Sequence, residues 1–521
     1  MQHEYTTRAE RIMQRIQALA AISEDADGVT RTFGTPAFLD GRDLVQRWFE
    51  AAGLPTRVDG IGNLRARLVS PDPDAKTFVL ASHIDTVVNA GKFDGSLGVL
   101  MGLDLLENLI ARNVELPFHI ELIAFSDEEG VRFHTTYLGS QVVTGAFDPT
   151  LLARCDEAGI SLDQALVAMG GDASQLALDA IPAAEWLGYF EMHIEQGPVL
   201  WERNVPVALV TAIAGQQRVE LTFRGMAGHA GTVPMNMRQD ALCAAAEFVL
   251  IAEQFAQAHG QGLVATVGKL AIGHAASNVI PGEITCSLDL RSPDALQLAD
   301  AYQALKTYTE ALALQRNVGL SWNLIQETAP VTSDVGLNRL LMQAIAGAGH
   351  QLLPLVSGAG HDAVPISAVA PVTMLFVRCF KGISHNPLED VELADLAAAL
   401  EVADGFLQLL TDTNQNTANW EEAQRRYPVG SLLTGEVMHQ ARFGVFVSTG
   451  IEGISGLAEI LDFVDAPVYS GIPRLPGTPL HEVKFPAVGE MVTGLVVGYR
   501  DRNKQISLSF KLNSASQTPA L

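Results

Sequence analysis

The chain of 521 residues is long enough for about three domains, each with a sizeable core. Its hydrophobic fraction of 48% and charged fraction of 18% are those of an ordinary globular protein, which argues against extensive disorder. The formal net charge of -25 argues against a general affinity for nucleic-acid phosphates, because an acidic surface repels them. A local basic pocket is not excluded.

The first seventeen residues carry charges throughout and contain no apolar segment of signal-peptide type. We expect no stretch that is long and apolar enough to span a membrane. The four cysteines lie far apart without C-x-x-C spacing, which favours reduced thiols over a disulfide framework or a zinc finger. The sequence therefore predicts a soluble, cytoplasmic protein.

Residues 1–212 alternate between helical and strand-like segments. Apolar spacing predicts helices at 5–22, 40–52 and 98–111, and short apolar runs predict strands at 62–69, 77–81 and 120–125. Such alternation is typical of a mostly parallel or mixed sheet with helices on both faces. We interpret residues 1–212 as the first part of an α/β catalytic domain.

Residues 213–328 follow a different pattern. A strand at 219–225, a helix at 238–258, strands at 263–273 and 283–292, a helix at 295–314 and a strand at 320–327 give the order β-α-β-β-α-β. This is the split βαβ arrangement of a compact ferredoxin-like domain. We call residues 213–328 the inserted domain, because the α/β pattern resumes after it at 329–412, with a helix at 338–348, a strand at 372–378 and a helix at 393–410.

The C-terminal part is predicted to be all-β. Residues 413–426 are interpreted as a linker, because 411–418 are polar and rich in Asn and Thr. Short strand-like runs separated by Gly and Pro then predict a small β-barrel within 427–521.

Several candidate metal ligands lie just beyond predicted strands or in loops rich in Gly and Pro. In open α/β sheets, binding sites form beyond the carboxyl ends of strands. The candidates are His83, Asp94, Glu128, Glu129, His193 and His385. Each has an ordinary alternative, since the acidic pair suits a solvated turn and the histidines suit structural or loop positions. Taken together at one edge of one sheet, they favour a metal site.

Two metal ions about 3.5 to 4 Å apart need a bridging carboxylate and terminal ligands on each side. We expect Asp94 to bridge the two ions. His83 and His193 would complete the coordination of one ion, and Glu129 and His385 that of the other. Imidazole and carboxylate ligands suit zinc or manganese, and they also accept cobalt or nickel.

Glu128 is then free to act as a general base beside the metals. It can take a proton from the attacking water and return it to the leaving nitrogen. Asp85 can hold the second ring nitrogen of His83 and so fix its tautomer.

The motifs of residues 5–410 resemble those of a known enzyme family. SHIDTV, GKFDGSLGV, DEEGVRF, HIEQGPVL, MAGHAGTVPM, SNVIPG, SGAGHDA and SHNPLEDV are similar, in sequence and order, to the amidase and carbamoylase branch of the metallopeptidase superfamily that includes aminoacylases and carboxypeptidases. The resemblance implies the same ligand set, with Asp94 as the bridge and Glu128 as the general base. It also implies hydrolysis of the C–N bond of a ureido group.

Members of this branch act on different ureido substrates. The segments DEEGVRF and TTYLGS look more like those of allantoate amidohydrolases, which favours allantoate as the substrate, with release of ammonia and carbon dioxide. N-carbamoyl-L-amino acids and the substrate of β-ureidopropionase come next, followed by dipeptides and acylated amino acids. An RNA-associated binding protein with a vestigial enzyme domain is the alternative of another class, and the complete ligand set speaks against it.

The resemblance also implies a substrate pocket. Gln196, Asn278, Arg291 and Gly360 match positions that hold the substrate, and Arg291 would pair with a substrate carboxylate through two parallel hydrogen bonds. His229 matches a histidine that reaches the partner subunit's site and steadies the developing oxyanion. We therefore expect a homodimer formed through the inserted domain. A surface ion pair for Arg291 and an ordinary loop histidine for His229 are the alternatives.

Residues 427–512 resemble the RNA-binding OB-fold domain named after ribosomal protein S-one. Phe443 and Phe446 match aromatic residues on which bases stack in that family. Gly456 stands where a histidine often lines the nucleic-acid face, acidic and basic residues are about balanced, and the loop at 465–481 is long. We therefore expect an OB-fold used for protein contact rather than for RNA.

Overall fold

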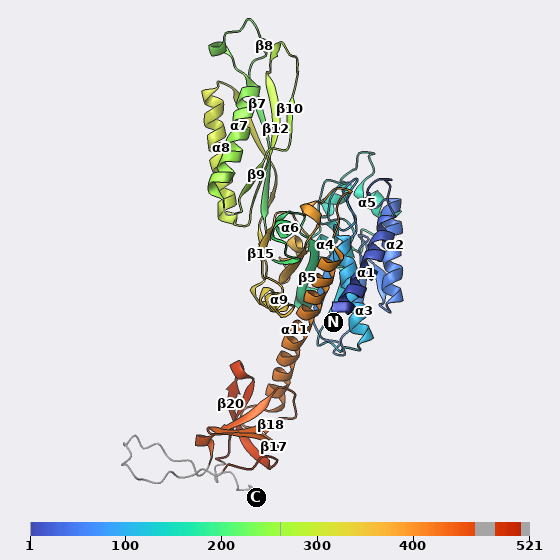
Figure 1. Ribbon diagram of the computed structural model, residues 1–521, viewed down its shortest axis with the longest axis vertical. Helices are drawn as coiled ribbons and strands as arrows, with labels where there is room; N and C mark the ends of the chain where they lie inside the picture. The colour runs from blue at the N-terminus through green and yellow to red at the C-terminus, as the bar shows by residue number, and fades with distance from the viewer. Residues whose placement is uncertain (1, 261, 464–484, 512–521) are drawn as a thin grey trace, which may run out of the picture. The chain divides into compact units, whose positions relative to one another are not determined.

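The structure is a computed structural model that describes residues 2–260, 262–463 and 485–511. The chain forms two compact units, Met1–Leu409 and Leu410–Leu521. The first unit contains a nine-stranded sheet and a separate five-stranded sheet with two long helices (Figure 1). Cys155, Cys243, Cys286 and Cys379 are free thiols, as the cysteine spacing predicts.

The larger sheet is mixed, as predicted. Its strand order is β1-β2-β4-β3-β5-β16-β6-β14, and β15 pairs with β6. The four central strands, in the order β4, β3, β5 and β16, are parallel to one another. On either side of them, β2 is antiparallel to β4, and β6 is antiparallel to β16. The strands are β1 (Thr56–Val58), β2 (Leu64–Leu68), β3 (Thr77–His83), β4 (His119–Phe125), β5 (Trp186–Ile194), β6 (Val207–Ile213), β14 (Val331–Thr332), β15 (Pro354–Ser357) and β16 (Val372–Val377).

Every residue of β3, β4 and β16 is buried, which is typical of a parallel sheet covered on both faces. The helices of this part of the chain are α1 (Gln2–Ala20), α2 (Pro36–Ala51), α3 (Ser96–Ala111), α4 (Leu138–Thr144), α5 (Leu162–Ala168), α6 (Val199–Arg203), α9 (Val335–Gly347) and α10 (Ala363–Ile366). The helix α2 begins four residues earlier than predicted, because the Thr35 side chain caps it and Pro36 is well tolerated in the first turn.

The strand β5 lies in the middle of the sheet, between β3 and β16. The sequence analysis did not predict it. Its run WLGYFEMHI is apolar and aromatic enough for a strand, but it contains Glu191 and His193, both of which are buried. These two polar side chains interrupt the apolar pattern, so the pattern did not predict a strand on which the site depends.

The inserted domain has the predicted β-α-β-β-α-β order. Its sheet runs β10-β12-β7-β13, and β9 pairs with β12. The elements are β7 (Gly215–Arg224), β8 (Gly228–His229), α7 (Ala241–His259), β9 (Val264–Thr266), β10 (Leu270–Ile272), β11 (Val279–Ile280), β12 (Glu283–Ser292), α8 (Ala295–Gln315) and β13 (Gly319–Thr328). The single strand predicted at 263–273 is two short strands. Between them the register with β12 shifts by one residue, from Thr266 opposite Asp289 to Leu270 opposite Cys286. At the shift, Lys269 N–H donates to the Ser287 hydroxyl while Ser287 N–H donates to Lys269 O.

The helix α7 corrects the prediction that no segment could span a membrane. Among the described residues, α7 is the helix that is long and apolar enough to cross a membrane, by length and composition alone. Its side chains at Ala241, Ala244, Ala245 and Phe248 are buried in the core of the inserted domain. The apolar character of α7 is therefore used in packing within this domain.

The prediction of an irregular linker at 413–426 is wrong. It is the last part of a 34-residue helix, α11 (Leu393–Arg426). Asn414 and Thr417 donate hydrogen bonds to main-chain carbonyls four residues earlier, so their side chains follow the helix instead of competing with it. Trp420 and Ala423 are buried in the core of the second unit, which gives this polar stretch a fixed place.

The second unit contains the predicted small β-barrel, closed in the order β17-β18-β19-β21-β20. Its strands are β17 (Leu432–Ala441), β18 (Gly444–Ser448), β19 (Ser455–Glu459), β20 (Met491–Arg500) and β21 (Gln505–Ser509). Phe443 is 52% exposed and its ring contacts that of Phe446 edge-on. Gly456 is buried, and a Cβ there would meet Leu508. The loop expected at 465–481 lies outside the described residues.

Arg31 connects three elements of the first unit. Its guanidinium is fully buried and donates to Ile84 O at 2.7 Å, Leu19 O at 3.1 Å and Ser96 Oγ at 3.0 Å. Burial lowers the pKa of Arg31 to about 10, although the charge of Asp85 opposes this. Arg31 thus satisfies a carbonyl at the end of α1, the exit of β3 and the start of α3.

We predict that Arg31→Met lowers the free energy of unfolding by about 3 kcal/mol, because it removes the Arg31 hydrogen bonds to Ile84 O and Ser96 Oγ and leaves Leu19 O with the Ile22 N–H as its remaining donor. Urea unfolding followed by circular dichroism measures the change. Arg112→Met, at an exposed arginine just beyond α3, is the control and should change stability by less than about 0.5 kcal/mol. Equal midpoints for the two variants would contradict the role of Arg31.

Candidate active site

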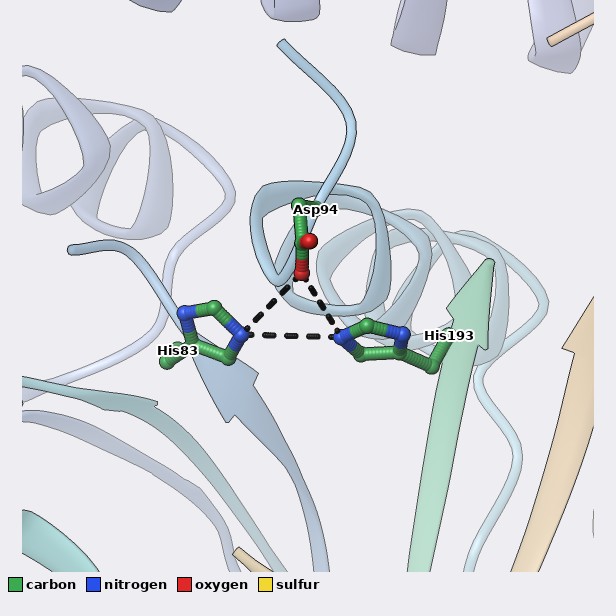
Figure 2. Close-up of side chains that lie close together, drawn as sticks. All are labelled: His83, Asp94 and His193. Carbon is green, nitrogen blue, oxygen red and sulfur yellow. Dashed lines mark hydrogen bonds and ion pairs between the residues drawn. The ribbon is translucent and has the colours of Figure 1, made fainter. Parts of the chain in front are cut away.

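Two histidines meet at the carboxyl edge of the central sheet (Figure 2). Leu80 of β3 pairs with Phe190 of β5, so His83 and His193 lie side by side three residues further along these parallel strands. Asp94 lies in the turn before α3, and its Oδ1 is 3.1 Å from His193 Nε2 and 3.5 Å from His83 Nε2. The two Nε2 atoms are 3.5 Å apart. Three potential ligand atoms therefore converge.

The second oxygen of the same carboxylate faces a second group. Asp94 Oδ2 is 3.2 Å from His385 Nε2, which is 3.3 Å from Glu129 Oε1. Ligand atoms of His83, Asp94 and His193 lie within 4.8 Å of one another, and so do those of Asp94, Glu129 and His385. Asp94 is thus common to the two groups, which is the arrangement that a bridging carboxylate requires.

The chemistry of the first group fits a cation. Asp94 Oδ1 is buried and lacks a hydrogen-bond partner among the described residues. Burial alone would raise the pKa of Asp94, but contacts with His193, His385 and His83 hold it well below its usual range. A carboxylate and two imidazole nitrogens that face one another match the donor set of a divalent transition metal.

Main-chain carbonyls fix the orientation of both imidazoles. His83 Nδ1 lies 3.0 Å from Asp85 O, and His193 Nδ1 lies 2.9 Å from Ile194 O. A proton on each Nδ1 leaves each Nε2 unprotonated and facing Asp94, and the Nε2 of His193 also accepts a hydrogen bond from the main-chain N–H of Gly95 at 3.3 Å. The sequence analysis expected Asp85 to hold the second ring nitrogen of His83. Its main-chain carbonyl is the nearer contact of His83 Nδ1, and its carboxylate Oδ1 lies 3.4 Å from the same atom.

The Asp85 carboxylate also holds the acidic turn. Its two oxygens accept hydrogen bonds from the main-chain N–H groups of Glu128, at 3.0 Å, and Glu129, at 3.1 Å. Burial raises the pKa of Glu128 well above its usual range, and the charge of His83 partly opposes this. A buried carboxyl group in a fixed position, with its pKa shifted toward neutrality, is suited to proton transfer.

Glu389 is a site residue that the sequence analysis missed. Its Oε1 accepts hydrogen bonds from the main-chain N–H groups of Phe93, at 2.7 Å, and Asp94, at 3.1 Å. Ser384 Oγ lies 2.8 Å from Asp94 Oδ2 and 3.1 Å from Glu389 Oε2. Glu389 is in the SHNPLEDV motif, but the sequence gives no reason to place it opposite Asp94.

A layer of buried polar residues behind His193 was also missed. The ring of His361 packs edge-on against that of His193 with centroids 4.6 Å apart, and its Nε2 is 2.7 Å from Ser357 Oγ. Glu191 and Asp362 are completely buried nearby, and within the described part of the chain each keeps one oxygen without a hydrogen-bond partner. The only signal in the sequence is that His361 and Asp362 belong to the SGAGHDA motif.

The structure brings three of the predicted substrate residues toward this region. Gln196 Nε2 donates to Asp94 Oδ2 at 2.8 Å. Arg291, on β12 of the inserted domain, donates from Nη1 to Gly358 O at 2.6 Å. Gly360 is in the same loop, and a Cβ there would clash with the hydroxyl of Tyr137. The absence of a side chain at Gly360 is therefore required by Tyr137.

His229 and Asn278 lie at the other end of the inserted domain. His229 is exposed on β8, and Ala230 N–H donates to Asn278 O at 2.9 Å. The register of β12 with β7 places Arg291 opposite Gln216, near the start of β7, whereas β8 follows the far end of that strand. From Gln216 to Arg224 at the far end of β7, eight residues at about 3.3 Å each span about 26 Å. One inserted domain does not bring His229 and Arg291 together.

Comparison with known proteins identifies the family. The model of Peptidase family M20/M25/M40 matches residues 79–409, which is more than half of the chain. The chain belongs to this family. The match confirms the resemblance found in the sequence, and it ends before the β-barrel.

Relatives in this family support the amidase and carbamoylase branch. The chain is 37% identical over 439 residues to an allantoate deiminase of Arabidopsis thaliana, covering 76% of this chain and 81% of that one. It is also 37% identical over 396 residues to an N-carbamoyl-L-amino acid amidohydrolase of Geobacillus stearothermophilus, covering 76% and 97%. A solved amidase of the hydantoinase/carbamoylase family from Burkholderia multivorans matches with 33% identity and a TM-score of 0.72, covering 77% and 97%.

We predict that Asp94→Asn reduces bound metal to near zero, because it removes an anionic ligand from both groups, whereas His385→Asn affects one group and leaves about half. Elemental analysis after manganese or zinc loading and dialysis measures the metal content. Asp300→Asn, at an exposed position of α8, should bind as much metal as the unaltered protein. Full metal content in Asp94→Asn would contradict the shared carboxylate.

Proposed function

We propose that the chain is a dinuclear metal-dependent amidohydrolase that cleaves the C–N bond of a ureido group. Allantoate is the leading substrate, with release of ammonia and carbon dioxide. The observation that carries the proposal is the Asp94 carboxylate shared by two groups of ligands. The names of the relatives support the substrate class.

His83 and His193 would hold one metal ion, Glu129 and His385 the other, and Asp94 both. Zinc or manganese suits these ligands best, and cobalt or nickel is compatible. Two bound ions would polarise a carbonyl oxygen and lower the pKa of water.

Glu128 is the proposed general base and acid. Its carboxylate takes a proton from the attacking water and gives it to the nitrogen that leaves the ureido carbon. Asp85 fixes the turn through two main-chain hydrogen bonds, so Glu128 needs no rearrangement before the proton moves.

The substrate carboxylate would pair with Arg291, while Gln196 and the main chain at Gly360 hold the ureido end. His229 would donate a hydrogen bond to the developing oxyanion, and Asn278 lies at the same end of the inserted domain. That end is about 26 Å along β7 from the register position of Arg291, so in this proposal the partner subunit of a homodimer supplies His229. The inserted domain thus acts as the lid and the dimer contact.

We assign residues 1–212 and 329–412 to the catalytic domain, in a cytoplasmic enzyme. For the barrel we favour protein contact over RNA. The rings of Phe443 and His439 are exposed and contact the partly buried ring of Phe446, but buried Gly456 leaves no room for a ring at its position.

A second candidate substrate class is N-carbamoyl-L-amino acids. The identity to the Geobacillus stearothermophilus enzyme is 37%, equal to that with the Arabidopsis thaliana allantoate deiminase. Both classes join a ureido group to a carboxylate, so Arg291 and the metal ligands serve either one.

We predict that the manganese- or zinc-loaded protein releases ammonia from allantoate faster than from a panel of N-carbamoyl-L-amino acids, including N-carbamoyl-β-alanine. Ammonia release measured side by side gives kcat/KM for each substrate. A preference for a carbamoyl amino acid would select the second candidate. No turnover of any ureido substrate by the loaded protein would contradict the proposal.

Glu128→Gln is the matched control for this assay. The amide keeps the size of the side chain but cannot accept the proton, so turnover should fall at least about a thousandfold while metal content stays near normal. Substantial activity in this variant would remove Glu128 from its role.

We also predict recovery of activity when inactive His229→Ala and Glu128→Gln chains form a mixed dimer. One of its two sites then receives an intact Glu128 from one subunit and an intact His229 from the other. Random exchange makes half of the dimers mixed, so about a quarter of the unaltered activity should return. Subunit exchange followed by ammonia release measures this. No recovery in dimers shown to be mixed would exclude sharing.

A further inference from the structure

Asp289 lies between two arginines on the polar face of the inserted domain's sheet. Its Oδ1 accepts a hydrogen bond from Arg291 Nε at 2.9 Å, and its Oδ2 accepts one from Arg291 Nη2 at 2.9 Å. On the neighbouring strand, Arg218 is its register partner, and Arg218 Nε donates to Asp289 Oδ2 at 3.2 Å. Arg218 Nη1 also donates to Gln326 Oε1 on β13. One carboxylate thus organises two guanidinium groups across three strands.

The contacts of Arg291 leave part of its guanidinium for a ligand. Asp289 occupies the edge formed by Nε and Nη2, in the two-pronged geometry that suits a carboxylate. Nη1 donates to Gly358 O. A guanidinium has five N–H groups, so one remains on Nη1 and one on Nη2. These two nitrogens form the other edge, which can take a second carboxylate.

This group of charges opens onto a cavity of about 880 Å³. Arg218, Glu220, Asp289 and Arg291 line it from the sheet, Val356 lines it from β15, and Gly358 lines it from the loop after β15. The formal charges of these two arginines and two carboxylates cancel, so the attraction for an anionic ligand comes from the N–H groups of Arg291 and not from the net charge of the lining. Burial alone would raise the pKa of Asp289, but hydrogen bonds from Arg291 and Arg218 hold it below its usual range.

We propose that Asp289 is a positioning residue that sets the preference for a substrate carboxylate, by holding the Arg291 guanidinium with its Nη1–Nη2 edge free. The proposal rests on the proposed function, in which Arg291 reads that carboxylate. Arg218 in turn holds Asp289. A side chain fixed before the substrate arrives loses little conformational freedom on binding, and this difference is about tenfold in affinity for one ordered side chain.

A purely structural role for Asp289 makes a different prediction, because a similar ion pair joins the same two strands at their other end. There, Arg224 Nε donates to Glu283 Oε2 at 3.0 Å, and Glu283 is the register partner of Arg224. Neither residue is among those that line the cavity. Glu283→Ala therefore removes a cross-strand carboxylate that does not line the cavity beside Arg291.

The test compares N-carbamoylglycine with its uncharged amide, N-carbamoylglycinamide, in the metal-loaded protein. In Asp289→Ala, the ratio of kcat/KM for the acid to that for the amide should fall about tenfold, through KM for the acid, while kcat changes less than about twofold. Glu283→Ala should leave the ratio unchanged. In the Arg291→Ala background, Asp289→Ala should have no further effect on the ratio. Thermal unfolding of both single variants checks that each is folded.

An unchanged ratio in folded Asp289→Ala would overturn the proposal. An increased preference for the acid would also overturn it, since Asp289 would then compete with the substrate for Arg291. If no ureido compound is hydrolysed, the proposed function fails separately. Calorimetric binding of N-acetylglycine and N-acetylglycinamide to the same variants then tests Asp289 alone, with the same tenfold loss of preference expected and an unchanged preference overturning it.

Discussion

The carboxylate of Asp94 is the point on which the first unit depends. It faces imidazole nitrogens from β3, from β5 and from the loop before α11, which are far apart in the sequence. An ionised carboxylate in a buried position is costly unless charged or polar partners surround it. Glu389 and Ser384 therefore hold its main-chain and side-chain atoms from one side, and the histidines hold it from the other.

Parallel strands explain why these residues meet. The strands β3, β4 and β5 end at the same edge of the sheet, so side chains at or just beyond their last residues converge without long loops. This geometry is what made His83, Glu128 and Glu129 predictable from sequence, because each follows a recognisable apolar run. His193 and His385 were predicted as ligands from their loop-like surroundings and from the motifs that contain them. The strand that carries His193 was not predicted, since its polar residues interrupt the apolar pattern.

The residues that sequence reasoning missed act through contacts that no local pattern encodes. Glu389 accepts hydrogen bonds from a main chain almost 300 positions away, and His361 packs on His193 from another element. Asp289 precedes Arg291 by two residues, yet its two-pronged grip is visible only in the folded sheet. The prediction of a linker at 413–426 failed for a similar reason. Its composition suggests a linker, but Trp420 and Ala423 find a barrel core that lies downstream in the sequence.

The attachment of the inserted domain has a consequence for how such a protein can be built. The chain leaves the central sheet after β6 and returns through β14, and Ile213 and Val331 are paired neighbours there. Gly215 and Pro330 are so close that a Cβ at Gly215 would meet the proline ring. A tight turn from residue 213 to residue 331 could close that pair without disturbing β6. The inserted domain is therefore a modular addition to one hairpin, and recombination at this neck could exchange substrate selectivity while the ligands of the central sheet stay intact.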